Sequence, residues 1–461
     1  MRFNSKAISK VIRRGFSLRL VIFFIMFSLI IQFSFTGIRR VSAQQNDGKG
    51  IPIIIVPGIM GSRLYDDKHQ LVWLEDSQID ILFKSLPGIG QKIKFSSENN
   101  KMKVRGNYNK QNHMSKELRE YGTRNEYKAI VDFLIEEFPE RDIYFFSYDW
   151  RLSVLQIADK LNKLILCVTK YGPGKVDIVA HSMGGLVASA FMKKFADGSA
   201  QQVGKIITCG TPYEGSPKTF YVLLPDRIQF DLKKIDKILL LADSVKFDPE
   251  KIVKIFFDIF SRVFAGLTFE VKCSFPSMQL LVPSLQYMEK YPFVSSYVEG
   301  DEYSAFSIAR DNYAEFLSMI FSSNKEGEKE FNFDIYNYIT SDANDIPLTH
   351  YGKRYNYLAS LPNTYFIVGI NQDTISSLGV ERNISNPSSF CSRVEDIKID
   401  TNGDGTVPYD SATMMGVLPH LLSRTGRYFE IAQDHGGTIN HYKARSEIKR
   451  MLEEPTTASV P

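Results

Sequence analysis

Short, mainly apolar runs alternate with longer amphipathic segments along much of the chain. The short runs predict buried strands and lie at Ile51–Val56, Asp142–Ser147, Val176–Ala180, Lys205–Cys209, Thr364–Ile370 and Tyr428–Ala432. Helical spacing is found between them, at Tyr127–Phe138, Val154–Val168, Gly185–Phe195 and Tyr442–Leu452. Strands separated by helices of this length are typical of an α/β fold, in which a mostly parallel sheet is covered by helices on both faces.

The alternation stops after Pro217 and resumes at Thr364, which indicates one α/β domain interrupted by an inserted cap. The expected parts are, in order, a first core part at 44–217, a cap or lid at 218–360, a second core part at 361–454 and a loose tail at 455–461. The cap is expected to be largely helical, because residues 249–267 show helical spacing with only a narrow polar stripe.

Residues 1–43 have the features of a targeting segment. They carry eight basic residues and no acidic ones, and their apolar stretch, Leu20–Phe35, is shorter than the about 20 residues that a membrane span needs. Small residues follow at Val41-Ser42-Ala43, as at the cleavage site of a secretory signal peptide. We expect a secreted, extracellular protein that starts near Gln44. The alternative is an uncleaved anchor that keeps the protein at the cell surface.

Composition excludes several classes of protein. Hydrophobic residues make up 44% of the chain and charged residues 23%, which excludes a mainly disordered or polytopic membrane protein. Without residues 1–43 the net charge is −4, so no general field favours nucleic acid. Four cysteines exclude a disulfide-dense scaffold. Cys167 and Cys209 lie in apolar runs and are expected to be buried thiols, whereas the sequence leaves open whether Cys273 and Cys391 form a disulfide.

The segment Ala180-His-Ser-Met-Gly-Gly185 directly follows a predicted strand and has the pattern of a nucleophile elbow. In such an elbow the turn from strand to helix is so tight that the residues two before and two after the serine must be small. The turn exposes the serine hydroxyl at the N-terminus of the following helix, where the helix dipole favours developing negative charge. Ser182 is therefore the candidate nucleophile.

A serine nucleophile needs a base and an acid that orients the base. In this topology both follow the serine in the chain, first the acid and then the histidine. His435, in the loop after the last predicted strand, is the candidate base, and His441 at the start of the final helix is the alternative. Asp404, in a glycine-rich loop, is the candidate acid, with Asp410 in reserve.

The acid loop also carries the letters D-x-N-x-D-G of a calcium-binding loop, starting at Asp400. Position twelve of that motif requires a bidentate Glu, and Ser411 stands there instead, so we expect no metal.

An ester carbonyl that is attacked by serine also needs two backbone N–H groups to hold its oxyanion. The amide of Met183 is one candidate, and the glycine-flanked loop Val56–Ser62 is expected to supply the other.

Five motifs resemble the lecithin:cholesterol acyltransferase family and occur in the family's order. They lie at Pro52–Leu64, Tyr148–Leu152, Ala180–Gly185, Gly210–Ser216 and Gly403–Val407. This family includes lysosomal phospholipase A2 and the phospholipid:diacylglycerol acyltransferases. The resemblance implies an α/β-hydrolase fold with a cap and no metal or organic cofactor. It further implies a triad of Ser182, Asp404 and His435, and an oxyanion hole formed by the amides of Met60 and Met183.

The resemblance implies a serine-dependent lipid ester hydrolase or acyltransferase that acts on phospholipid or glycerolipid esters through an acyl-serine intermediate. Water as acceptor would give a fatty acid, and a lipid alcohol would give a new ester. The helix expected at 249–267 is either buried in the cap or a lid that contacts a lipid surface transiently. The alternative function is a catalytically inactive secreted protein of the same fold that binds lipid or a surface partner.

Overall fold

The computed structural model describes the chain in several stretches. These are residues 50–65, 68, 71–73, 127–170, 172, 174–223, 274–299, 302–308, 313, 316–317, 357–382 and 393–455. The chain divides into two compact units, Met1–Gly48 and Lys49–Pro461, and every described residue belongs to the second. The expected signal peptide, the helix at 249–267, Cys273, Cys391 and residues 456–461 lie outside the described residues. Secretion and cap contact with lipid therefore stay predictions.

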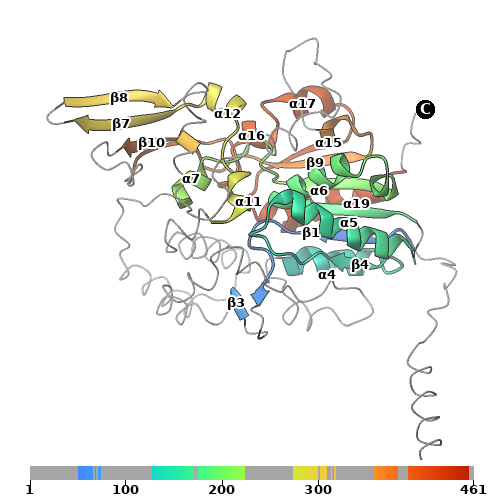
Figure 1. Cartoon of the computed structure of the whole chain (residues 1–461). Coiled ribbons are helices and arrows are strands. Elements are labelled where there is room, and N and C mark those ends of the chain that lie inside the picture. The colour runs from blue at the N-terminus through green and yellow to red at the C-terminus, as the bar shows by residue number, and fades with distance from the viewer. Residues whose placement is uncertain are drawn as a thin grey trace, which may run out of the picture. The chain divides into compact units, whose positions relative to one another are not determined.

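A six-stranded sheet forms the centre of the described structure (Figure 1). Its strands are β1 (Ile53–Val56), β4 (Ile143–Phe145), β5 (Val176–His181), β6 (Val203–Cys209), β9 (Thr364–Gly369) and β12 (Tyr428–Ile431). They lie in the order β12-β9-β6-β5-β1-β4, and every neighbouring pair is parallel. All six strands predicted from the hydrophobic pattern are present, with ends that differ by at most a few residues.

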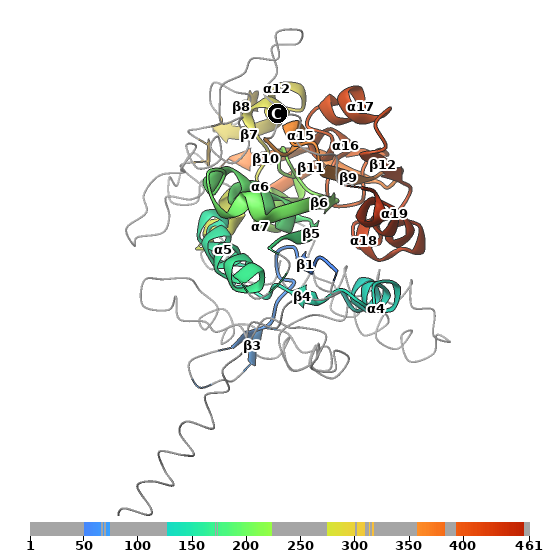
Figure 2. The same cartoon turned by 90° about the vertical axis from the view of Figure 1, so that its right-hand side faces the viewer.

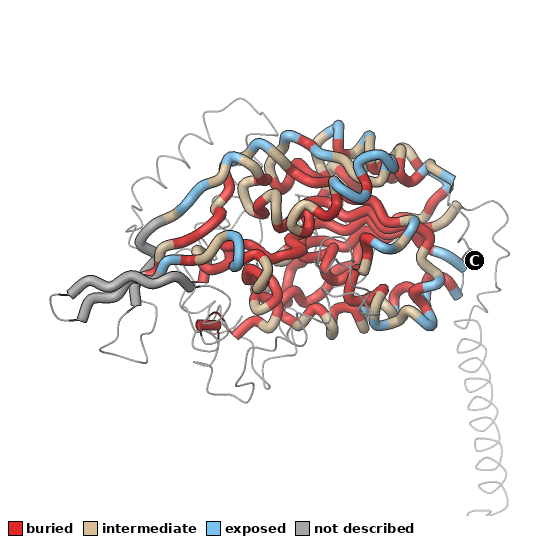
Figure 3. Tube along the Cα trace, turned by 90° about the horizontal axis from the view of Figure 1, so that it is seen from above, coloured by how far each residue is buried: buried red, intermediate tan, exposed pale blue. Residues whose placement is uncertain are grey.

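Both faces of this sheet are buried, which explains why its strands read as nearly continuous apolar runs. In β1, Ile54 and Val56 face one core cluster while Ile53 and Ile55 face the other. The first cluster is covered by α5 (Val154–Lys170) and α6 (Met183–Lys194), and the second by α4 (Lys128–Glu137) and α19 (Tyr442–Glu453). Figure 2 shows these helix pairs on opposite sides of the sheet, and Figure 3 shows the strands as a buried layer between them.

The helix α5 corrects one prediction about the cysteines. Its buried residues recur at helical spacing, and Leu164, Ile165 and Val168 belong to this stripe. Cys167 falls outside the stripe and is exposed, so the prediction of a buried thiol at this position is wrong. Cys209, at the end of β6, is buried as predicted, and burial raises the pKa of its thiol.

The strand order creates a switch point between β1 and β5. From β1 the chain moves to β4 on one side, and it then crosses back to β5 on the other side of β1. Ligands of open parallel sheets bind at the carboxyl ends of the strands beside such a switch point. The loop Pro57–Ser62 follows β1, and Ser182 follows β5, so both lie at this place.

A second sheet, of four strands, was not predicted. Its strands are β7 (Phe293–Glu299), β8 (Glu302–Ile308), β10 (Thr374–Arg382) and β11 (Arg393–Asp400), in the order β11-β10-β7-β8. The hairpin β7–β8 lies within the residues expected to form the cap, and β7 pairs in parallel with β10, which lies beyond the expected boundary at 360. The described part of the cap is thus both helical and stranded. The domain boundaries themselves stay predictions.

Shorter elements complete the described residues. They are β2 (Leu64–Tyr65), β3 (Leu71–Trp73), η3 (Ser199–Gln202), α7 (Lys218–Leu223), α11 (Pro276–Gln279), α12 (Leu285–Lys290), α15 (Tyr357–Ser360), α16 (Tyr409–Ala412), α17 (Val417–Leu422) and α18 (Gly437–Asn440). None of the helices in these stretches is long and apolar enough to cross a membrane.

Glu214 connects the core to α12. The Ser284 amide donates to the Glu214 carbonyl (2.9 Å), the Ser284 hydroxyl donates to its carboxyl group, and the same hydroxyl caps α12 by accepting from the Tyr287 amide. The Glu214 side chain is buried, and this burial raises its pKa to about 7. The Gly210–Ser216 motif therefore fixes the start of α12 to the core.

Candidate active site

The turn between β5 and α6 holds Ser182 in a strained conformation. Its φ of 55° and ψ of −128° are uncommon for a residue with a side chain. The glycines after it have no room for a side chain: a Cβ on Gly184 would lie 2.3 Å from the Val56 carbonyl oxygen, and one on Gly185 would lie 2.0 Å from Thr211 Oγ1. The small residues of the elbow motif are thus required by the close approach of β1 and of the loop after β6.

Ser182, His435 and Asp404 form a continuous hydrogen-bonded chain of buried side chains. His435 Nε2 lies 2.9 Å from Ser182 Oγ, and His435 Nδ1 lies 2.7 Å from Asp404 Oδ2. Ser182 follows β5 and His435 follows β12, both in the six-stranded sheet. Asp404 follows β11 of the four-stranded sheet and is bridged to Gln372, just beyond the end of β9. The arrangement has the geometry of a nucleophile, a base and an orienting acid.

The Asp404 carboxylate is fixed by its own loop. Its Oδ1 accepts hydrogen bonds from the amides of Thr406 (2.9 Å) and Val407 (2.6 Å). Gly405 has a φ of 82°, which permits the turn that brings these amides back to the Asp404 side chain. The other oxygen, Oδ2, is left to face His435. The glycine-rich sequence that pointed to Asp404 therefore builds the turn that aims its carboxylate.

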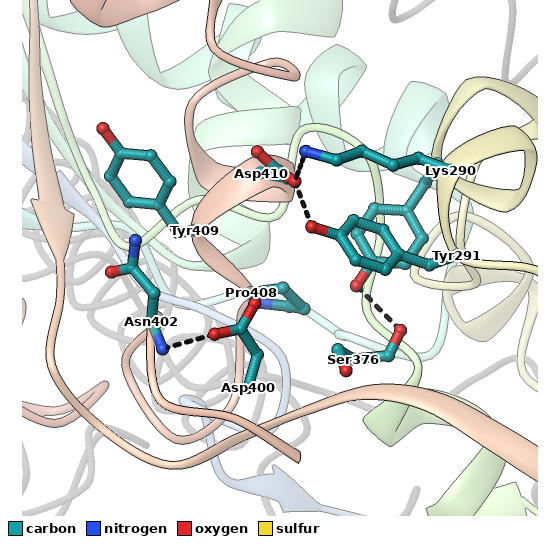
Figure 4. A pocket seen from close by; sticks show the side chains of 9 residues that line it. Lys290, Tyr291, Ser376, Asp400, Asn402, Pro408, Tyr409 and Asp410 are labelled. Atoms are coloured by element: carbon teal, nitrogen blue, oxygen red, sulfur yellow. Dashed lines mark hydrogen bonds and ion pairs between the residues drawn. The ribbon is translucent and has the colours of Figure 1, made fainter. Parts of the chain in front are cut away.

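Neither of the two alternative residues joins this chain. His441 caps α19, where its Nδ1 accepts a hydrogen bond from the Lys443 amide (3.3 Å). The Asp410 carboxylate is bound at 2.5 Å by Lys290 Nζ and by the Tyr291 hydroxyl (Figure 4).

Asp410 lines a polar cavity of about 200 Å³ beside the acid loop. Asp400 lines the same cavity and accepts a hydrogen bond from the Asn402 amide (3.0 Å), as Figure 4 shows. Asp400 and Asp404, the two acids of the calcium-like motif, thus point to different places, because Asp404 contacts His435. Within the described stretches, no three His, Cys, Asp or Glu side chains are placed to hold a metal ion.

The loop after β1 lies directly against the serine. A Cβ on Gly58 would be 2.7 Å from Ser182 Cβ and 3.2 Å from its Oγ. The Tyr148 hydroxyl donates to the carbonyls of Pro57 (2.6 Å) and Gly58 (3.2 Å), which fixes the carbonyl side of the loop. The backbone of the loop is therefore held within contact distance of Ser182.

Three amides, two in the loop after β1 and one at the start of α6, make no hydrogen bond within the described part of the chain. They belong to Ile59, to Met60, whose φ is 61°, and to Met183, the first residue of α6. The first N–H groups of a helix have no partner inside it, so Met183 is able to donate to a ligand. The oxyanion roles of Met60 and Met183 stay predictions, and the Ile59 amide is an additional candidate that sequence reasoning did not consider.

The motif at 148–152 supports this loop from behind. Besides the Tyr148 hydroxyl, the Tyr148 amide donates to Ser62 Oγ and the Trp150 indole donates to the Ser62 carbonyl, both at 3.1 Å. Arg151 and Asp149 form a buried bidentate ion pair with distances of 3.0 and 2.7 Å. The motif therefore has a structural basis in holding the loop that follows β1.

Sequence reasoning missed two polar side chains beside the triad. His181 Nδ1 lies 2.9 Å from the Tyr127 hydroxyl, and His181 Nε2 lies 2.9 Å from the His435 carbonyl oxygen. His181 is too close to Ser182 in the chain to act as its base. The signal for it was a histidine at the end of a buried, mainly apolar strand, because a buried imidazole needs hydrogen-bonding partners.

Comparison with known proteins gives matches in sequence and in fold. The sequence model for lecithin:cholesterol acyltransferase matches residues 91–232. Phospholipase A(1) LCAT3 from Arabidopsis thaliana is 37% identical over 78 residues, which are 16% of this chain and 17% of that protein. The matched region thus spans about a sixth of the length of this curated relative.

A chain of the solved Tle4–Tli4 complex is similar in structure, with a TM-score of 0.54 and 15% identity over 87% of this chain and 98% of that chain. At this identity the likeness concerns the fold alone. The parallel sheet, its switch point and the elbow after β5 confirm the expected α/β-hydrolase fold. In sequence, residues 91–232 match the lecithin:cholesterol acyltransferase family, which the five motifs resemble.

Proposed function

We propose that the protein is a serine-dependent lipid ester hydrolase that acts on phospholipid or glycerolipid esters. The observation that carries this proposal is the hydrogen-bonded chain from Ser182 through His435 to Asp404, with distances of 2.9 and 2.7 Å. The choice of a lipid ester is supported by the family match and by the relative that is named a phospholipase A(1).

The reaction proceeds through an acyl-serine intermediate. His435 Nε2 takes the proton of Ser182 Oγ as this oxygen attacks the ester carbonyl carbon. Asp404 accepts a hydrogen bond from His435 Nδ1–H and stabilises the imidazolium that forms. When the tetrahedral intermediate collapses, the bond to the leaving alcohol breaks and the alcohol takes the proton from His435. Water then attacks the acyl group with His435 again as base, which releases the fatty acid and restores Ser182.

The oxyanion of each tetrahedral intermediate is held by backbone amides. We assign this role to Met183 and Met60, with the adjacent Ile59 amide available in the same loop. Their lack of hydrogen bonds within the described residues supports this assignment, because donors already aimed at developing charge need no reorganisation during the reaction.

The substrate proposal is tested by analysis of products. Purified protein is mixed with phosphatidylcholine vesicles that carry radiolabelled acyl chains, with and without added diacylglycerol or sterol. We expect labelled free fatty acid in both cases, with protein inactivated by a serine-reactive phosphonate as the control. Labelled ester of the added alcohol would instead identify an acyltransferase. A protein that releases no acyl group and is not modified by the phosphonate would be a binding protein of the same fold.

Replacement of Gly58 by alanine is expected to lower kcat by about 10²-fold while the fold is retained. The new Cβ would overlap Ser182 Cβ, at 2.7 Å, so either the loop or the nucleophile must move. A shift of about 1 Å in such a site is enough for a loss of this size. The measurement is the steady-state kinetics of a soluble ester, together with the thermal unfolding midpoint.

The control is Ser446→Ala, which removes an exposed hydroxyl that donates to the Tyr442 carbonyl (3.0 Å) on α19. Equal activity of the Gly58 and Ser446 variants would contradict the close approach of the loop to Ser182.

A further inference from the structure

A line of three hydrogen bonds connects the loop after β1 to the loop that carries the base. The Gly58 amide donates to the Tyr127 hydroxyl oxygen (2.8 Å), which lies 2.9 Å from His181 Nδ1. His181 Nε2 lies 2.9 Å from the His435 carbonyl oxygen. All four residues are buried, and the line joins segments that are separated by 69, 54 and 254 positions in the sequence.

The two ends of the line fix its direction. A backbone N–H only donates, and a backbone carbonyl only accepts. Because the His435 carbonyl only accepts, His181 Nε2 must carry a proton that it donates to this oxygen. Nδ1 of a neutral His181 then has no proton and accepts from the Tyr127 hydroxyl. Uncharged His181 with its proton on Nε2 thus allows all three hydrogen bonds of the line to form at once.

The surroundings of His181 favour this uncharged form. Its ring lies 4.7 Å, centroid to centroid, from the ring of His435. Burial, and next the neighbouring His435, lower the pKa of His181 to about 3. A second positive ring at this distance would oppose the imidazolium that His435 forms during the reaction. Neutral His181 is therefore able to hold the base loop without weakening the base.

The line complements the contacts made by Tyr148. Tyr148 holds the carbonyls of Pro57 and Gly58, whereas Tyr127 holds the amide of Gly58, so the first peptides of the loop are fixed from both sides. At the other end, the His435 carbonyl accepts from His181 and from Thr438 Oγ1 (2.7 Å). The position of the base relative to the loop therefore depends on His181 and Tyr127.

We propose that Tyr127 and His181 are positioning residues that hold the His435 loop and the loop after β1 in register with Ser182. The proposal rests on the proposed serine mechanism and adds two residues to it. Neither residue exchanges a proton with the substrate; both act by fixing backbone groups on either side of the nucleophile.

The test uses the full protein and three variants. His181→Phe keeps the ring and removes both nitrogens, Tyr127→Phe removes only the hydroxyl, and the third variant combines the two changes. Tyr213→Phe is the matched control, because its buried hydroxyl donates to Thr208 Oγ1 (2.8 Å), outside the line. Values of kcat and KM are measured with a soluble ester, and folding is checked by thermal unfolding.

Loss of positioning should lower kcat and leave KM nearly unchanged. We expect kcat to fall by about 10²-fold in His181→Phe and about 10-fold in Tyr127→Phe, because misplacement of a catalytic group by about 1 Å has effects of this size. Residues of one network are not additive, so the double variant should be no slower than His181→Phe. The side-chain amide of His181→Gln is able to donate to the His435 carbonyl. We therefore expect kcat of His181→Gln to be about 10-fold higher than kcat of His181→Phe, because one of the two lost hydrogen bonds is restored.

Native kcat in both single variants would overturn the proposal, as would a double variant whose loss equals the product of the single losses. If His181→Phe does not fold, Tyr127→Phe and Tyr213→Phe decide the question, since equal losses in these two would reduce the role of Tyr127 to general stability. Failure of the serine mechanism is recognised separately, because the unmodified protein would then not react with the phosphonate.

Nitrogen-15 spectroscopy of the seven histidines tests the direction of the line. The signal of His181, assigned by its loss in His181→Phe or His181→Gln, should show a proton on Nε2 only and should not titrate between about pH 5 and 8, where an ordinary histidine does. Titration of His181 in this range, or a proton on Nδ1 alone, would contradict the proposed direction.

Discussion

Replacement of Ser182 by alanine is expected to lower kcat on the order of 10⁶-fold, which is the size of loss that removal of a triad serine produces. Ser182 Oγ is the only atom of the proposed triad that forms a bond to the substrate, so His435 and Asp404 have nothing to activate without it. The fold should be retained, because Ser182 is held by its backbone: its amide donates to the Cys209 carbonyl (2.9 Å) and its carbonyl accepts from the Gly185 amide (3.0 Å).

Two measurements check this expectation. Steady-state kinetics give the loss in kcat, and mass spectrometry after phosphonate treatment should locate the adduct on the peptide that contains Ser182. The control is Ser446→Ala, which removes an exposed hydroxyl that donates to the Tyr442 carbonyl (3.0 Å) on α19. If the Ser182 variant still turned over esters at the native rate, or if the adduct formed on another serine, the proposed nucleophile would be wrong.

Replacement of Asp404 by asparagine is expected to lower kcat about 10⁴-fold, as in triads where the buried acid is exchanged for its amide. Thr406 and Val407 would continue to donate to Oδ1, so the asparagine would turn its NH₂ group toward His435 Nδ1. An imidazole that accepts at Nδ1 carries its proton on Nε2, and this tautomer is unable to take the proton of Ser182. The loss should therefore appear in kcat without unfolding of the protein.

Asp410→Asn is the matched control for Asp404. Asp410 lies in α16, just after the loop that holds Asp404, but its carboxylate is bound by Lys290 and Tyr291 and does not contact His435. We expect this variant to lose no more than about 3-fold, the scale of a change outside the reacting groups. A large loss in Asp410→Asn together with near-native activity in Asp404→Asn would reverse the assignment of the acid.

Local patterns in the sequence were sufficient to predict the core strands and the candidate nucleophile. The strands of a doubly covered parallel sheet are apolar on both faces, as Ile53 and Ile54 are, so they stand out as short continuous runs. The elbow around Ser182 is recognisable because its small residues are imposed by contacts within a few ångströms, such as that of Gly184 with β1. Asp404 was found for a similar reason, since its loop needs glycine at position 405.

Features that depend on contacts between distant segments could not be predicted in this way. β7 pairs with β10, and nothing in either segment specifies the partner. Tyr127 looks like an ordinary core residue and His181 only like a buried histidine in need of partners, and their joint position becomes visible only when the helix α4 is packed against the sheet. Which backbone amides of a loop lack a hydrogen-bonding partner is equally hidden, which is why sequence reasoning did not consider Ile59 beside Met60.

The order of the strands also sets the order in which the site is completed during synthesis. β6 pairs directly with β9, with Ile206 opposite Thr364, so this ladder forms only after the whole intervening segment has been made. Contacts of such long sequence separation form late and slowly in folding. Asp404 and His435 both follow β9 in the chain. A nascent chain therefore carries Ser182 long before its partners exist, and under the proposed mechanism an unfinished molecule is unable to attack the lipids around it.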